Sequence, residues 1–131
     1  MTVANPGVKY EARVTSVGPL VAEFIDSHIV VLYREGAPEE LAEFSILHDG
    51  QVLHAPVTPG DTVVLDDAPF RVLAVGDVAN SNLANLGHLV MKFNGETAPE
   101  MPGDVCIETR PIPPLHVGSR LQILSAGVES A

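Results

Sequence analysis

The histidines are the residues of this chain best suited to chemistry at neutral pH. An uncharged imidazole offers a nitrogen electron pair that can attack an electrophile without special activation. The chain of 131 residues contains five of them. They are His28, His48, His54, His88 and His116. Their settings along the sequence differ, so each predicts a different role.

His48 ends the short apolar run 44–47 and is followed by Asp49-Gly50. The apolar run predicts a strand, and Asp-Gly predicts a turn directly after it. A histidine at this junction is expected to sit on a rigid element with its ring facing solvent. That setting suits a catalytic nucleophile, and it suits equally well a solvated residue beside a turn.

Three further histidines have settings that favour structural roles. His28 opens the apolar run 28–33 and His116 lies in a proline-rich connection, so both predict ordinary surface or strand-end positions. His88 directly follows Gly87, where an expected helix ends. A histidine there can cap the last helical carbonyls, which we favour over a direct catalytic role.

A metal site is the alternative chemistry for these side chains. His54 follows His48 by six residues, and across a hairpin the two rings would approach one another. With His88 as a third ligand, they would form a small metal-binding barrel. Two histidines without a carboxylate or third histidine at a defined spacing are a weak metal pattern, so this is the secondary hypothesis.

Arg34 is one of only seven cationic residues, and it adjoins Glu35 and the Gly36 turn. One interpretation is a surface ion pair that contributes less than about 1 kcal/mol. The other is a guanidinium whose paired N–H donors stabilise a doubly charged phosphoryl group. Spacing does not decide between the two.

Several other chemistries lack their sequence patterns. The single cysteine, Cys106, excludes an internal disulfide and a CxxC pair, and its alternating context 104–109 predicts a buried structural thiol. No GxSxG, GK[ST], HExxH or GxGxxG pattern is present. We therefore predict no nucleotide site and no cofactor.

Composition and charge limit the class of protein. Apolar residues make up 46% and charged residues 18%, and no run reaches the roughly 18 residues of a spanning helix. The formal net charge of -10 disfavours nucleic acid, and it fits either a partner with a basic face or solubility alone. The first ten residues lack a secretory pattern. We expect one domain over residues 1–131, in the cytoplasm and without membrane insertion.

Eleven glycines and eleven prolines divide the chain into short segments rich in valine, isoleucine and leucine, which predicts a mainly β protein of about eight strands. The expected strands are 9–18, 27–33, 44–48, two within 62–76, 88–95, 104–109 and 119–125. Two short helices, each of about two turns, are expected between them. Pro38 suits the first position of one, while Asp77 and Gly87 suit the N-cap and the left-handed end of the other.

The two halves of the chain also suggest a loose repeat of roughly 43 residues. It matches Gly36, Leu41, Gly50 and Pro59-Gly60-Asp61 with Gly76, Leu83, Gly95 and Pro102-Gly103-Asp104. Two such units that share strands would close into a small Greek-key-like barrel with no exposed sheet edges.

Two long segments carry a family resemblance. LYREGAPEELAEFSILHDG (32–50) and VLAVGDVANSNLANLGHLVMKFNG (72–95) resemble the IIA component of the glucitol/sorbitol-specific phosphotransferase system, and the similarity runs from about Tyr10 to Leu124. The resemblance implies a cytoplasmic phosphocarrier. In that family a histidine accepts a phosphoryl group from the histidine-containing phosphocarrier protein and passes it to a cysteine of the IIB component. The membrane component IIC then moves and phosphorylates the polyol.

The resemblance places the phosphoryl acceptor at His48. His88 lies in the family-like LGH segment and is the reserve or assisting residue. Members of the family carry a second histidine shortly after the first, whereas here Asp49-Gly50 follows without one. A third hypothesis is a regulatory domain that kept the fold and lost phosphorylation. Retention of His48 argues against it.

Overall fold

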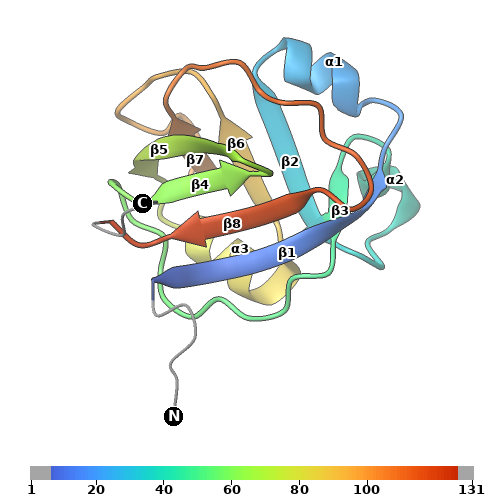
Figure 1. The fold of residues 1–131 in the computed structure, drawn as a ribbon, viewed down its shortest axis with the longest axis horizontal. Coiled ribbons are helices and arrows are strands. Elements are labelled where there is room, and N and C mark those ends of the chain that lie inside the picture. Colours follow the sequence, from blue (N-terminus) through green and yellow to red (C-terminus); the bar gives the residue numbers. More distant parts are fainter. Residues whose placement is uncertain (1–6, 127–131) are drawn as a thin grey trace.

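The computed structural model describes residues 7–126, which form a closed barrel of eight strands with three short helices (Figure 1). The strands are β1 (Val8–Val17), β2 (Ile29–Arg34), β3 (Ile46–His48), β4 (Thr62–Leu65), β5 (Ala68–Val75), β6 (Leu89–Lys92), β7 (Asp104–Ile107) and β8 (Arg120–Leu124). The helices are α1 (Val21–Asp26), α2 (Glu39–Ala42) and α3 (Ala79–Leu86). The mainly β closed barrel predicted from the sequence is confirmed, and each of its expected strands is present.

The strand order around the barrel is β1-β3-β2-β6-β7-β5-β4-β8. Two neighbouring pairs, β2 with β3 and β6 with β7, are parallel, and the other pairs are antiparallel. In Figure 1, α1 and α2 lie on the right-hand side of the barrel and α3 lies below it. None of the described helices has the length and apolar character required to cross a bilayer.

The helices differ from the prediction in number and in detail. A third helix, α1, is present that the sequence does not predict. It has six residues and only one buried side chain, Val21, so it shows no apolar periodicity. Helix α2 has only four residues, and Pro38 occupies its N-cap. Helix α3 begins after Val78 instead of Asp77, but it ends as predicted at Gly87, which is left-handed with φ 62°.

The barrel does contain two related halves, but their spacing differs from the predicted repeat. Val17 pairs with Ile46 between β1 and β3, and Val75 pairs with Val105 between β5 and β7. Along β1 and β5 a register shift precedes each of these pairings, and β3 and β7 each also have a parallel neighbour. Corresponding residues are thus 58 or 59 positions apart. The spacing of 43 residues is wrong.

The glycines that suggested the spacing of 43 have different roles. Gly36 has a positive φ of 92° and open space where a Cβ would stand, so it forms a turn. At Gly76 a Cβ would lie 2.2 Å from the carbonyl oxygen of Pro102. The true counterpart of Gly76 is Gly18, where a Cβ would lie 2.2 Å from the carbonyl oxygen of Ala42.

The barrel interior is apolar, with few buried polar side chains. They are Ser45, His48, Asp61, Asp104 and Ser119. The two buried carboxylates have cationic partners, since Lys9 Nζ lies 2.7 Å from Asp61 and Lys92 Nζ lies 2.8 Å from Asp104. The hydroxyls of Ser45 and Ser119 donate to Leu41 O and to the Asp66 carboxylate, so His48 is the remaining buried polar side chain whose role has to be explained.

Candidate functional site

His48 is the last residue of β3, which lies between β1 and the parallel strand β2. Its side chain is 0% exposed. The expected solvent-facing ring is therefore wrong for this state of the protein. The backbone of Gly50 folds back over the ring from one side, and Gly87 approaches it from the end of α3.

Both ring nitrogens of His48 have backbone partners. The Gly50 N–H donates to Nδ1 over 3.0 Å, and Nε2 lies 2.8 Å from the carbonyl oxygen of Gly87. An amide N–H only donates and a carbonyl only accepts, so Nδ1 carries the free electron pair and Nε2 carries the proton. The ring is held as one neutral tautomer.

The surroundings of His48 keep it uncharged at neutral pH. Burial lowers the pKa of the imidazole, the hydrogen bond to Gly87 raises it, and the charge of Arg34 lowers it again. The net effect is a pKa below the ordinary value of 6.5. A neutral nitrogen is the form that can act as a nucleophile.

Arg34 ends β2 and is the direct register partner of His48 in β3. Its guanidinium donates to three carbonyl oxygens: Nε to Gly50 at 2.7 Å, Nη1 to Asn85 at 3.3 Å and Nη2 to Gln51 at 3.4 Å. Within residues 7–126 it forms no ion pair, with Glu35 or any other carboxylate. Its guanidinium beside His48 is therefore bonded to backbone carbonyls and not to a carboxylate.

Gly50 connects the side chains of His48 and Arg34. Its N–H is bonded to the imidazole of His48 and its carbonyl oxygen to the guanidinium of Arg34. A Cβ at this position would lie 2.6 Å from the ring of Tyr10, so only glycine fits here. The backbone of Gly50 occupies the space between a nucleophilic nitrogen and a cation.

The remaining candidates lie near this site or away from it. Asp49 follows His48 and could have oriented its ring, but its Oδ1 accepts from the backbone N–H of Arg13 at 2.8 Å. A backbone carbonyl, that of Gly87, supplies the orienting bond. His88 donates from Nδ1 to Leu32 O at 3.1 Å, and its ring stacks on that of Tyr33 in β2. The His88 ring therefore does not cap α3.

The metal hypothesis finds no support. Among the residues that the structure describes, no three His, Cys, Asp or Glu side chains are grouped to hold an ion. His54, His28 and His116 are exposed. Cys106 is buried as predicted, and burial raises the pKa of its thiol.

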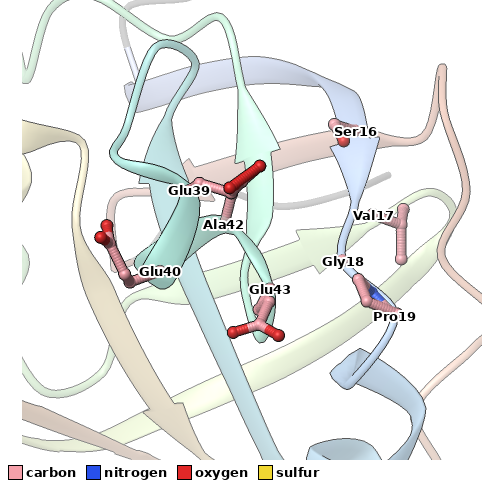
Figure 2. Close-up of a pocket in the computed structure, with 8 residues that line it drawn as sticks. All are labelled: Ser16, Val17, Gly18, Pro19, Glu39, Glu40, Ala42 and Glu43. Atoms are coloured by element: carbon pink, nitrogen blue, oxygen red, sulfur yellow. The ribbon is translucent and has the colours of Figure 1, made fainter.

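A surface cleft of about 500 Å³ lies elsewhere, between α2 and the end of β1 (Figure 2). It contains neither His48 nor Arg34. The carboxylates of Glu39 and Glu40 at its edge point in different directions (Figure 2). These two carboxylates do not converge on a common ligand.

A family comparison identifies the family of the chain. The family model described as PTS system glucitol/sorbitol-specific IIA component matches residues 9–122. The chain belongs to the glucitol/sorbitol-specific IIA family of the phosphotransferase system. The family resemblance found in the sequence is confirmed. A IIA component of this system has a phosphotransfer role and works with other proteins of the same system.

Individual relatives of this IIA chain agree. The PTS system glucitol/sorbitol-specific EIIA components of Shigella flexneri and Escherichia coli K12 are each 33% identical over 106 residues, which cover 81% of this chain and 85% of the relative. A PTS system IIA component from Enterococcus faecalis V583 has a similar crystal structure, with a TM-score of 0.75. That match covers 87% of this chain and 98% of the other at 21% identity, and it shows the fold.

The buried neutral imidazole makes the stability of this IIA chain depend on pH. Because the pKa of His48 in the folded chain lies below 6.5, the unfolded chain binds a proton first as the pH falls. The contribution of the neutral His48 ring to the free energy of unfolding is complete above pH 6.5. It is lost as the pH falls from 6.5 through the lower pKa of the folded chain. Urea unfolding at pH 7.5 and pH 5 should show a larger loss of stability in the wild type than in His48→Gln. An equal loss in both would contradict this.

Proposed function

We propose that this IIA chain is a cytoplasmic phosphocarrier in which His48 accepts a phosphoryl group from the histidine-containing phosphocarrier protein. It then passes the group to the cysteine of the IIB component, for polyol uptake through IIC. The observation that carries the proposal is a neutral imidazole held beside Arg34, a guanidinium that forms no ion pair among residues 7–126. Membership of the family supplies the class of reaction.

The chemistry needs no nucleotide. The electron pair of the His48 nitrogen forms a new N–P bond while the N–P bond of the donor histidine breaks, and its electron pair returns to the donor ring. In the second transfer the cysteine thiolate attacks phosphorus, an S–P bond forms, and the electron pair of the broken N–P bond returns to His48. Such in-line transfers depend on position and charge stabilisation.

Transfer requires an opening of the site, because His48 is buried and both its nitrogens are bonded. Gly50, which covers the ring from one side, and Gln51, whose carbonyl accepts from Arg34, lie near the start of the connection 49–61, which has no helix or strand. A displacement of Gly50 would release Nδ1 of His48 and Nε of Arg34 together.

Arg34 supplies the charge stabilisation in this proposal. Its fork of N–H donors, released from the backbone carbonyls, would bind the oxygens of the phosphoryl group. Arg34→Ala should slow phosphoryl transfer to the IIA chain by about a hundredfold, measured by rapid quench with phosphorylated carrier protein. The transfer rate of Arg34→Lys should lie between that of the wild type and that of Arg34→Ala.

Arg13 provides a matched control for Arg34. It also donates to a backbone carbonyl, that of Gly118 at 3.1 Å, and has no carboxylate partner among the described residues. Arg13→Ala should leave the rate within about twofold of the wild type. If Arg34→Ala behaves as Arg13→Ala does, Arg34 does not belong to the site.

His88 is proposed only as an assisting, positioning residue. It holds Leu32 O and follows Gly87, whose carbonyl orients His48. His88→Ala should therefore slow phosphorylation and leave the phosphoryl group on His48. Labelling that survives the loss of His48 and vanishes in His88→Ala would instead make His88 the acceptor.

The proposal is tested by incubation of the chain with enzyme I, the phosphocarrier protein and phosphoenolpyruvate. Under mildly alkaline conditions, where phosphohistidine survives, mass measurement should show one added phosphoryl group. Peptide mapping should place it on His48, and nitrogen NMR should identify the phosphorylated nitrogen. An unlabelled chain would support the regulatory hypothesis instead.

A further inference from the structure

A buried hydroxyl next to His48 has no partner in this structure. Tyr10 is 2% exposed, and its Oη forms no hydrogen bond with any described residue. Buried polar atoms are nearly always paired, because leaving one unpaired costs about 1–3 kcal/mol. The other such side-chain atom among residues 7–126 is Oγ1 of Thr15 at the irregular part of β1. Tyr10 differs from Thr15 because its hydroxyl lies at the functional site.

Three contacts locate the hydroxyl. The Tyr10 ring meets the His48 ring edge-on, with centroids 5.8 Å apart and planes at 87°. A Cβ added to Gly50 would lie 2.7 Å from Oη, so the hydroxyl abuts the residue that separates His48 from Arg34. The Arg34 guanidinium is close enough to lower the pKa of Tyr10, although no hydrogen bond of good geometry joins the two.

We infer that the Tyr10 hydroxyl is a phosphoryl-binding group, which donates a hydrogen bond to the phosphoryl group on His48 once Gly50 has moved aside. The inference rests on the proposed function of His48. It gives the unpaired hydroxyl a partner that exists only in the phosphorylated state. Arg34 and Tyr10 then bind two of the phosphoryl oxygens, and the third faces the visiting protein.

The chemistry of the neighbours favours an incoming acceptor. Arginine carries donors only, so it cannot accept the proton of Tyr10. The Gly50 carbonyl is already bonded to Arg34 Nε at 2.7 Å. Burial is the largest influence on the pKa of Tyr10 and raises it, so the hydroxyl keeps its proton. A phosphoryl group brings three strong acceptor oxygens to this cluster of donors.

The substitution Tyr10→Phe separates this role from a structural one. In the unphosphorylated protein it removes a polar atom that has no partner, so the thermal unfolding midpoint should be unchanged or higher. In the phosphorylated protein it removes a donor to a charged group. The equilibrium of phosphoryl exchange with the phosphocarrier protein should shift about tenfold toward the carrier protein.

Tyr33 is the matched control, since it is the only other tyrosine of the chain. Its ring stacks on His88 at 4.0 Å between centroids, and Tyr33→Phe preserves that ring. This variant should leave the exchange equilibrium within about twofold of the wild type. Labelling Cζ of both tyrosines with ¹³C gives a readout in the unmodified chain, because phosphorylation should shift the Tyr10 resonance more than the Tyr33 resonance.

The outcomes distinguish the two proposals. A wild-type chain that is phosphorylated on His48, with an unchanged equilibrium in Tyr10→Phe and an unmoved Tyr10 resonance, would overturn only the role of Tyr10. A chain that is not phosphorylated on His48 would overturn both. If Tyr10→Phe unfolds at a lower temperature than the wild type, the hydroxyl has a structural partner and the inference fails.

Discussion

His48→Gln is expected to abolish phosphoryl labelling, with a loss of at least a thousandfold in the rate of transfer from the phosphocarrier protein. Glutamine offers an amide in place of the imidazole, and an amide nitrogen has no free electron pair for attack on phosphorus. In the proposed reaction a nitrogen of His48 is the sole nucleophile, so a variant that keeps Arg34 but lacks this imidazole should have no activity. Mass measurement after incubation with enzyme I, the carrier protein and phosphoenolpyruvate checks the result.

The choice of glutamine matters because His48 is also part of the core. His48→Ala leaves a cavity and strips the Gly50 N–H and the Gly87 carbonyl of their partner, which should cost about 2–4 kcal/mol of stability. Loss of labelling in that variant would therefore have two causes. Urea unfolding should show that His48→Gln is the more stable of the two.

His54→Ala is the matched control for the His48 variants. His54 is exposed, and its backbone N–H donates to the carbonyl oxygen of Lys9, a bond that the substitution preserves. Labelling and unfolding should both match the wild type. Labelling of His48→Gln at the wild-type rate would show that another residue accepts the phosphoryl group.

The sequence located the acceptor candidate but not its environment. The family-like segments indicate His48, and Arg34 is a candidate because it adjoins a turn in a chain with few cations. The burial of the ring was missed because the covering groups are backbone atoms of Gly50 and Gly87. Every residue except proline has the same backbone donor and acceptor, so no side-chain pattern predicts where these groups meet a ring.

Tyr10 was missed for a related reason. It lies in an alternating strand where an inward-facing aromatic residue predicts core packing, and it is indeed almost fully buried. What sets it apart is an unpaired hydroxyl beside a histidine that is distant in sequence. That relation depends on the pairing of β1 with β3, which local patterns do not specify.

The strands themselves were predictable because each depends on a local run of apolar and β-branched residues between turn residues. The internal repeat was not, because glycine has several uses that look alike in a sequence. Gly36 supplies a positive φ, whereas Gly18 and Gly76 supply the absence of a side chain. Matching them by type alone gave the wrong spacing.

Gly18→Ala and Gly76→Ala are expected to be among the most destabilising single substitutions in the barrel, each by about 3 kcal/mol or more. At both positions the new Cβ would lie 2.2 Å from a backbone carbonyl oxygen, which cannot rotate away as a side chain would. The N–H of each glycine also bonds the residue that precedes or begins the partner strand: Gly18 to Ser45 O at 3.0 Å and Gly76 to Asp104 O at 2.8 Å. Relief of the clash would break these bonds.

Gly36→Ala separates the steric clash expected at Gly18 and Gly76 from the strain of a positive φ. No atom lies within 4 Å of its added Cβ, so the cost is that of a side chain at φ 92°, about 1 kcal/mol. Urea unfolding of the three variants should therefore give two large, similar losses and one small one. The similarity follows from the spacing of 58 residues between Gly18 and Gly76, which puts them at equivalent close approaches, one within each half. A small loss at either glycine would mean that the halves are related in topology but not in packing.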